Sequence, residues 1–177
     1  MRRSVVLSLL SLLVLSTALS ATTVVYVPLK RAVQMSDLVL VGHVLSMESV
    51  YNAEGEIVTR VDLLVEEPLK GMAQPGEIFS FHAWGGSLDG TVVETVGEAR
   101  YRLGEKIMVQ LENINGEFHT LGLSFGKWNV VRDEAGGQWV TRSLDDLNMV
   151  NVKESPVTRV SLDRMREITR GSGRLSF

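Results

Sequence analysis

The sequence predicts a mainly β protein: a small, closed or partly open β-barrel with a short N-terminal helix and a C-terminal helix. Two observations carry this prediction. Short runs of strand-forming residues recur between turn residues at regular intervals. Helical periodicity occurs only around residues 29–36 and 161–171. The chain has 177 residues, 45% of them hydrophobic, which suits one domain with an adequate core.

Residues 1–20 have the pattern of a signal peptide. Two arginines open the segment, residues 5–15 form an apolar stretch broken only by serines, and small residues precede the end at Ser20. An uncleaved membrane anchor is the alternative, but the apolar stretch is shorter than the ~20 residues that span a bilayer. We therefore expect cleavage before Ala21, export to the periplasm or the medium, and no stable membrane insertion afterwards.

Charge and cysteine usage narrow the class of protein further. The chain has 18 basic and 21 acidic residues, and removal of residues 1–20 takes away two of the basic ones and none of the acidic ones. The mature chain is thus acidic, which argues against a nucleic-acid partner. It has no cysteine, so its stability must come from the core, as is common in bacterial envelope proteins.

The longest predicted hairpin spans residues 37–71. Its first strand is apolar on both faces, which indicates that both faces are covered. Gly42 inside this strand predicts a β-bulge. The second strand begins near Ile57 with clean alternation, and we expect it to end at Pro68, because proline cannot donate to a strand ladder.

The rest of the chain predicts further short strands and one helix. Asn115-Gly116 is a strong hairpin turn, and Ser161 is a good helix N-cap, with Gly171 placed to end that helix. The predicted strands are 77–84, 91–96, 105–112, 117–124, 127–132 and 138–142. The predicted division is a signal peptide (1–20), an N-terminal segment with a short helix (21–36), the barrel (37–150) and a C-terminal helical tail (151–177).

Several stretches together resemble the netrin-like module, whose best-known members are the tissue inhibitors of metalloproteinases. They are the run SDLVLVGHV, the end of the second strand at Leu69-Lys70-Gly71, the strand FSFHAW with the Gly-rich loop after it, and the later Leu103-Gly104-Glu105-Lys106. The resemblance is one of pattern and spacing, and it covers roughly residues 21–123. It implies an OB-type barrel of five strands.

The resemblance also implies a function and a place for it. In the animal inhibitors, the free mature N-terminus chelates the zinc of a metalloprotease beside the loop after the third strand. The matching positions are Ala21 and Thr22 at the terminus, and Trp84, Gly85, Gly86 and Ser87 in the loop. This chain lacks the cysteines that anchor the terminus in those inhibitors. The leading expectation is an exported, non-enzymatic binding module, with a zinc metalloprotease as one kind of partner.

Other candidate chemistry is sparse. His43, His82 and His119 lie on different predicted strands, so we favour ordinary surface or half-buried strand histidines over a three-histidine metal site. Neighbouring acids such as Glu66-Glu67 should point to opposite faces and be solvated. The sequence therefore predicts no catalytic residue, no metal and no cofactor.

The three tryptophans leave a second class of function open. Trp84, Trp128 and Trp139 could form aromatic platforms for an extended glycan or peptide across a barrel face. The preferred interpretation is that they are packed at the barrel ends. A glycan- or peptide-binding envelope protein is one alternative, and a small hydrolase with an unrecognised site is another.

Overall fold

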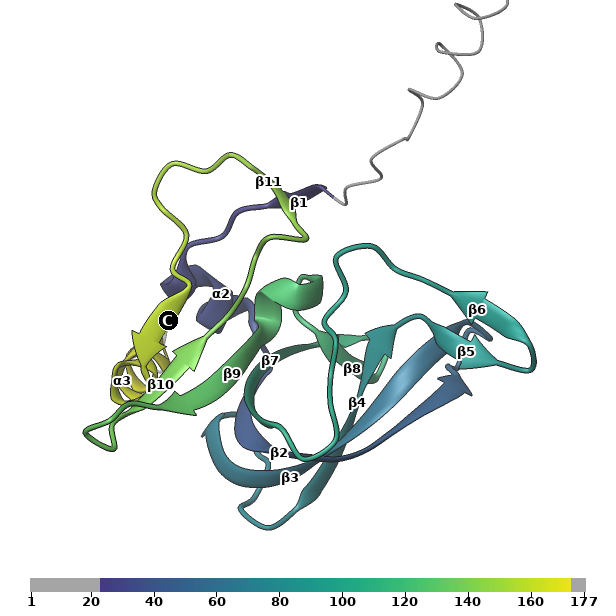
Figure 1. Ribbon diagram of the computed structural model, residues 1–177, viewed down its shortest axis with the longest axis horizontal. Coiled ribbons are helices and arrows are strands. Elements are labelled where there is room, and N and C mark those ends of the chain that lie inside the picture. The colour runs from purple at the N-terminus through teal and green to yellow at the C-terminus, as the bar shows by residue number, and fades with distance from the viewer. Residues whose placement is uncertain (1–22, 173–177) are drawn as a thin grey trace, which may run out of the picture.

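The computed structural model describes residues 23–172 (Figure 1). The predicted signal peptide, with Ala21 and Thr22 after it, lies outside these residues. In chain order the elements are β1 (Thr23–Val25), α2 (Leu29–Met35), β2 (Leu38–Tyr51), β3 (Ile57–Lys70), β4 (Ile78–Trp84), β5 (Gly86–Leu88), β6 (Thr91–Val93), β7 (Lys106–Ile114), β8 (Glu117–Thr120), the 3-10 helix η1 (Leu123–Gly126), β9 (Lys127–Arg132), β10 (Gln138–Thr141), β11 (Asn148–Val150), β12 (Arg159–Ser161) and α3 (Leu162–Ser172).

Five strands form a ring. β2 pairs with β3, β3 with β4, β4 with β8, β8 with β7, and β7 with β2 again. The β4–β8 pairing is parallel and the other four are antiparallel. Buried apolar side chains from these strands fill the inside, among them Leu40, Leu63, Phe81, Ile107 and Leu111. The predicted fold class, mainly β with a barrel-like sheet and a short helix toward each end, is confirmed.

The β2–β3 hairpin bends where the sequence predicts. The strand register shifts between Val41 and Gly42, and a Cβ at Gly42 would lie 2.1 Å from the carbonyl oxygen of Leu64. Only glycine permits that approach of the two backbones.

The prediction that Pro68 ends the second strand is wrong. β3 continues to Lys70, and Pro68 pairs with Leu40 of β2. The register with β4 runs only as far as Leu64. Two more hydrogen bonds follow, from the Val65 amide to the Glu77 carbonyl and from the Gly76 amide to the Val65 carbonyl. Beyond that point β3 is an edge strand on this side, where the missing N–H of proline removes no ladder bond.

A second core lies on the outer face of β2 and β7. β7 also pairs with β9, which continues the sheet through β10 to β12. Val39 and Val41 of β2 point to this side, opposite to Leu38 and Leu40. α2 and α3 cover it, on the side of the molecule away from β5 and β6 (Figure 1). The predicted burial of both faces of this strand is thus confirmed.

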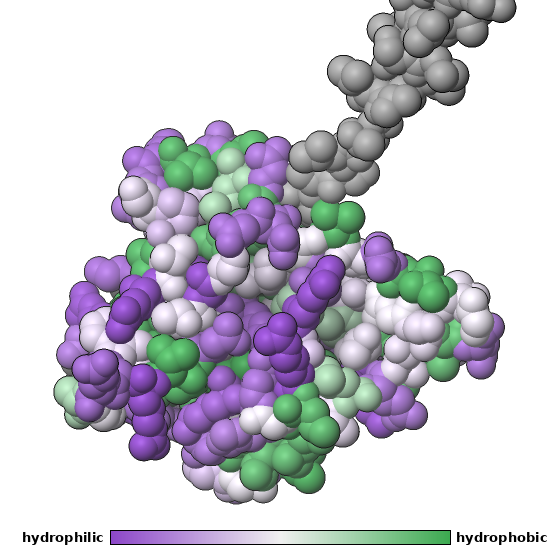
Figure 2. All heavy atoms as spheres, in the orientation of Figure 1, coloured by the Kyte–Doolittle hydropathy of each residue, from purple (hydrophilic) through white to green (hydrophobic). Residues whose placement is uncertain are grey.

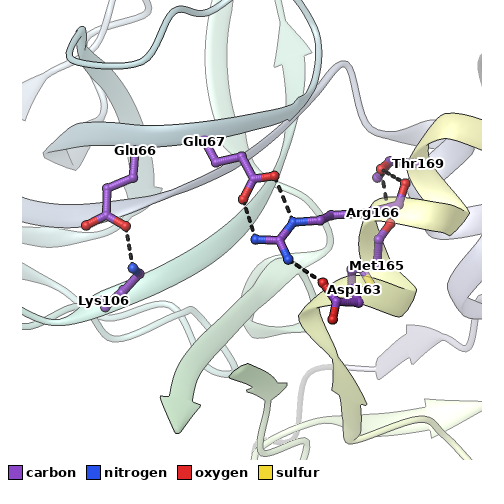
Figure 3. Close-up of polar contacts among 7 residues, drawn as sticks. All are labelled: Glu66, Glu67, Lys106, Asp163, Met165, Arg166 and Thr169. Atoms are coloured by element: carbon purple, nitrogen blue, oxygen red, sulfur yellow. Dashed lines mark hydrogen bonds and ion pairs between the residues drawn. The ribbon is translucent and has the colours of Figure 1, made fainter. Parts of the chain in front are cut away.

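Charged residues fix α3 on β3. Figure 3 shows Glu67 pointing toward the helix, where its two oxygens accept hydrogen bonds of 2.8 and 2.7 Å from Arg166. Glu66 turns the other way and pairs with Lys106 of β7. The prediction of opposite faces holds for this pair, but both acids are ion-paired. Ser161 caps the helix by accepting the Arg164 amide hydrogen at 3.2 Å.

The N-terminal strand pairs with a segment that is distant in the sequence. β1 pairs in parallel with β11, with Thr23 opposite Asn148. A third apolar cluster beneath them includes Tyr26, Phe125 and Leu147. No helix within residues 23–172 has the length and apolar character needed to cross a membrane.

Candidate functional site

An open groove of about 730 Å³ lies where the chain leaves β4. One part of its wall is formed by Trp84, Gly85 and Gly86, and another by residues 93–101. Asp145 and Asp146, from the segment between β10 and β11, complete the lining. Three of the residues predicted for a partner site therefore line one cavity. Beside it, β5 and β6 form an arm that carries apolar side chains on its surface (Figure 2), and Val92 is 67% exposed there.

Glycines shape this groove. Gly85 has a φ of 88°, and a Cβ there would lie 2.5 Å from the Val93 carbonyl oxygen. The Gly85 carbonyl accepts a hydrogen bond from the Thr59 hydroxyl at 2.8 Å. These contacts hold a tight turn that brings the strands of the arm against the end of β4.

Ser87 is placed differently from the sequence prediction. It lies in β5, where its amide donates to the Ser49 hydroxyl at 3.0 Å, and it is not among the groove-lining residues. The run Gly85-Gly86-Ser87 was expected to be loop, but a strand starts at Gly86. The difference arises because β5 has β6 to pair with, through Gly86 and Val93.

Glu98 is a groove residue that the sequence reasoning missed. Its Oε1 accepts the Ala99 amide hydrogen at 2.8 Å, and its Oε2 is buried without a hydrogen-bond partner among the described residues. Burial raises the pKa of this carboxyl from 4.5 to about 7. It therefore changes charge near neutral pH. No motif marks it, because a single glutamate between Gly97 and Ala99 looks like ordinary surface charge.

The charge of the groove is mainly negative. Its lining includes four acids, Glu94, Glu98, Asp145 and Asp146, and one basic residue, Arg100. The two aspartates are exposed. A groove of this composition favours cationic or hydrogen-donating ligands over phosphates.

The described chain begins close to one rim of the groove. Thr23 pairs with Asn148, and Asp146, which lines the groove, precedes Asn148 by two residues. Ala21 and Thr22 themselves lie outside the described residues. The proximity of the predicted mature terminus to the loop after Trp84 therefore stays a prediction.

The histidines divide into two places. His43 lies against Glu66, with 3.0 Å between its Nε2 and the carboxylate. His82 and His119 are opposite each other in the β4–β8 pairing, with ring centroids 5.5 Å apart. His119 is only 1% exposed, so the expectation of a surface or half-buried histidine is wrong for this residue. Its pKa is lowered by burial and then by His82, and raised by Glu117.

The tryptophans do not gather on one face. Trp128 is fully buried in the second core, as the preferred interpretation predicts. Trp139 lies in β10, outside the ring, and its indole N–H donates to Asp133 at 2.8 Å. Only Trp84 reaches the groove, and its ring stacks on His119 with centroids 4.2 Å apart. A continuous platform of the three rings is therefore excluded.

Comparison with known proteins gives no relative from which the role of this groove could be inferred. No protein-family model, no curated protein and no solved structure matches this chain.

Proposed function

We propose that the chain is an exported, non-enzymatic binding module that holds an extended segment of a partner protein in the groove after Trp84. The observation that carries the proposal is the groove itself, which is walled by the end of a ring strand and by the glycine turn. Export is proposed from the signal-peptide pattern of residues 1–20.

The shape and charge of the groove favour a polypeptide ligand. An open groove suits an extended chain rather than a small molecule, which proteins usually bury almost completely. The exposed rim acids Asp145 and Asp146 would attract lysine, arginine or a free amine on that chain. Exposed valines on the arm beside it offer apolar contact area.

A more specific version of the proposal makes the partner a zinc metalloprotease. The five-stranded ring with one parallel pairing supports an OB-type, netrin-like interpretation. The pairing of Thr23 with Asn148 supports a mature terminus near the groove. In this version the α-amine of Ala21, a group whose ordinary pKa is about 8, would bind the protease zinc as a neutral ligand.

The general proposal is tested with one pair of charge-reversing variants. The probes are short extended peptides rich in lysine, compared with the same peptides carrying glutamate. We expect the lysine peptides to bind the wild-type chain and Glu134→Lys, which alters an exposed acid in the β9–β10 turn. Asp146→Lys should bind at least about tenfold more weakly, because it reverses a charge on the rim. Equal binding by both variants would refute the groove as the site.

The protease version has its own test. Inhibition of a zinc metalloprotease is measured with the chain that begins at Ala21 and with a form carrying one extra residue before it. Strong inhibition by the first and loss by the second is expected, because the added residue moves the free amine away from the metal. Equal inhibition by the two forms would rule out chelation by the terminus.

A further inference from the structure

The parallel pairing that closes the ring gathers three ligand-type side chains. His82 of β4 and His119 of β8 are direct partners in that pairing. Glu117 lies two residues before His119 on the same strand, so its side chain leaves the same face of the sheet. Two strands that are distant in sequence therefore bring two imidazoles and a carboxylate together.

The distances among these groups suit a bound ion. Glu117 Oε2 lies 3.3 Å from His82 Nδ1 and 3.8 Å from His119 Nε2. One ligand atom from each of the three residues can be chosen so that all lie within 4.8 Å of one another. Ligand atoms around a tetrahedral Zn²⁺, bound at about 2.0–2.2 Å, are separated by about 3.3–3.6 Å. Small side-chain adjustments close the difference.

Unsatisfied polar atoms provide a second, independent observation. His82 Nδ1, Glu117 Oε2 and His119 Nδ1 are all buried, and none has a hydrogen-bond partner among the described residues. The imidazole nitrogen of His82 approaches the Glu117 carboxylate without forming a hydrogen bond. Buried polar atoms are nearly always satisfied in native proteins, so an unsatisfied atom on each of the three residues, with those of His82 and Glu117 only 3.3 Å apart, calls for a bound group.

The surroundings hold these side chains in place. The other carboxylate oxygen of Glu117, Oε1, accepts the amide hydrogen of Ala53 at 3.2 Å, which leaves Oε2 directed at the histidines. The Trp84 ring lies on His119 at an interplanar angle of 15° and fixes the imidazole plane. Outer contacts of this kind orient metal ligands in known sites. The carboxylates of Glu54 and Glu56 act electrostatically on His119 and add negative potential that favours a cation.

We propose that His82, Glu117 and His119 form a binding site for one divalent transition-metal ion, with Zn²⁺ the best match. Two imidazole nitrogens and one carboxylate oxygen are donors that zinc accepts readily, and three protein ligands leave a fourth position open to water or to a group of a partner. The competing interpretation is a simple ion pair between His82 and Glu117.

Zn²⁺ itself is the probe in the first experiment. The full chain, in whichever processed form accumulates, is dialysed against Zn²⁺ and then against metal-free buffer, and retained zinc is measured by mass spectrometry. We expect one zinc per chain in the wild type and in His43→Ala, which removes the histidine that pairs with Glu66 instead. His82→Ala and the isosteric Glu117→Gln should lower the affinity by at least about tenfold, since even outer-contact changes cost 10–100-fold.

Titration with Co²⁺ separates this site from adventitious surface binding. Co²⁺ held by four or five ligands absorbs visible light far more strongly than hydrated Co²⁺ on the surface. This absorption should appear in the wild type and His43→Ala and disappear in Glu117→Gln. Circular dichroism of Glu117→Gln confirms that the variant is folded. No zinc retained by the wild type, or equal loss in His43→Ala, would overturn the proposal. Neither readout depends on a peptide or a protease, so failure here is distinct from failure of the groove.

Discussion

At the scale of single residues, Glu98 is the groove acid whose pKa is raised by burial. It is a carboxyl that burial keeps protonated up to about pH 7, against 4.5 for an ordinary glutamate. Its position between Gly97 and Ala99 gave no sign of this, because burial depends on the segments that fold over it. The groove therefore contains a proton-binding group whose state changes in the physiological range.

Glu98 should make the stability of the protein depend on pH. The folded state holds this proton more tightly than the unfolded chain, so the free energy of unfolding should fall as the pH rises from 4.5 to about 7. We expect the loss to be on the order of 2 kcal/mol greater in the wild type than in Glu98→Gln, whose amide does not titrate. Urea unfolding at both ends of this range measures it, with Glu134→Gln as a control. Equal pH slopes in wild type and Glu98→Gln would contradict the assignment.

At the scale of elements, local chemistry predicted the hairpin turn, the bulge and the N-terminal cap, whereas Gly171, expected to end the helix, lies within α3. Asn115 and Gly116 both have positive φ, at 53° and 95°, as their hairpin turn requires. The cap at Ser161 and the bulge at Gly42 are confirmed. These features depend on the backbone preferences of one or two residues, which the sequence states directly.

Pairings between distant segments were beyond such reasoning. The β4–β8 pairing rests on one pair of opposing residues, His82 and His119. β1 pairs with β11, which is separated from it by most of the sequence. No local pattern specifies either, because their register is set by how the ring closes and by the cluster around Tyr26. The convergence of His82, Glu117 and His119 was missed for the same reason.

The docking of α3 provides a test at this scale. Arg166 makes its paired hydrogen bonds with Glu67 of β3, whereas Arg164, within residues 23–172, forms its ion pair inside the helix with Glu167. Replacing Arg166 by alanine should lower the free energy of unfolding by about 1 kcal/mol, since the contact is half-buried and bidentate. Arg164→Ala should change it by less than about 0.5 kcal/mol. Chemical denaturation of both variants makes the comparison, and equal effects would mean that the contact to Glu67 does not hold the helix.

At the scale of the whole molecule, the helix-covered second core and the candidate groove are separate. The second core, α2 and α3 lie on one side of β2 and β7, and the β5–β6 arm lies at the other end of the ring (Figure 1). The groove adjoins this arm, because Gly86 of β5 and Val93 of β6 line it. Trp84, Gly85 and Gly86, which the sequence singled out, line the groove, and their role in binding a partner stays a prediction. The sequence did not reveal the acidic rim, because Asp145 and Asp146 reach the groove only through the fold.

The central claim is that the groove after Trp84 holds an extended segment of a partner. The most direct measurement is the change in backbone amide chemical shifts when a lysine-rich peptide is added to the isotope-labelled protein. We expect the largest changes at Gly85, Gly86, residues 94–98 and Asp146, and much smaller ones in Asp146→Lys. Changes centred elsewhere, for example around the highly exposed Met72 in the β3–β4 turn, would contradict the account.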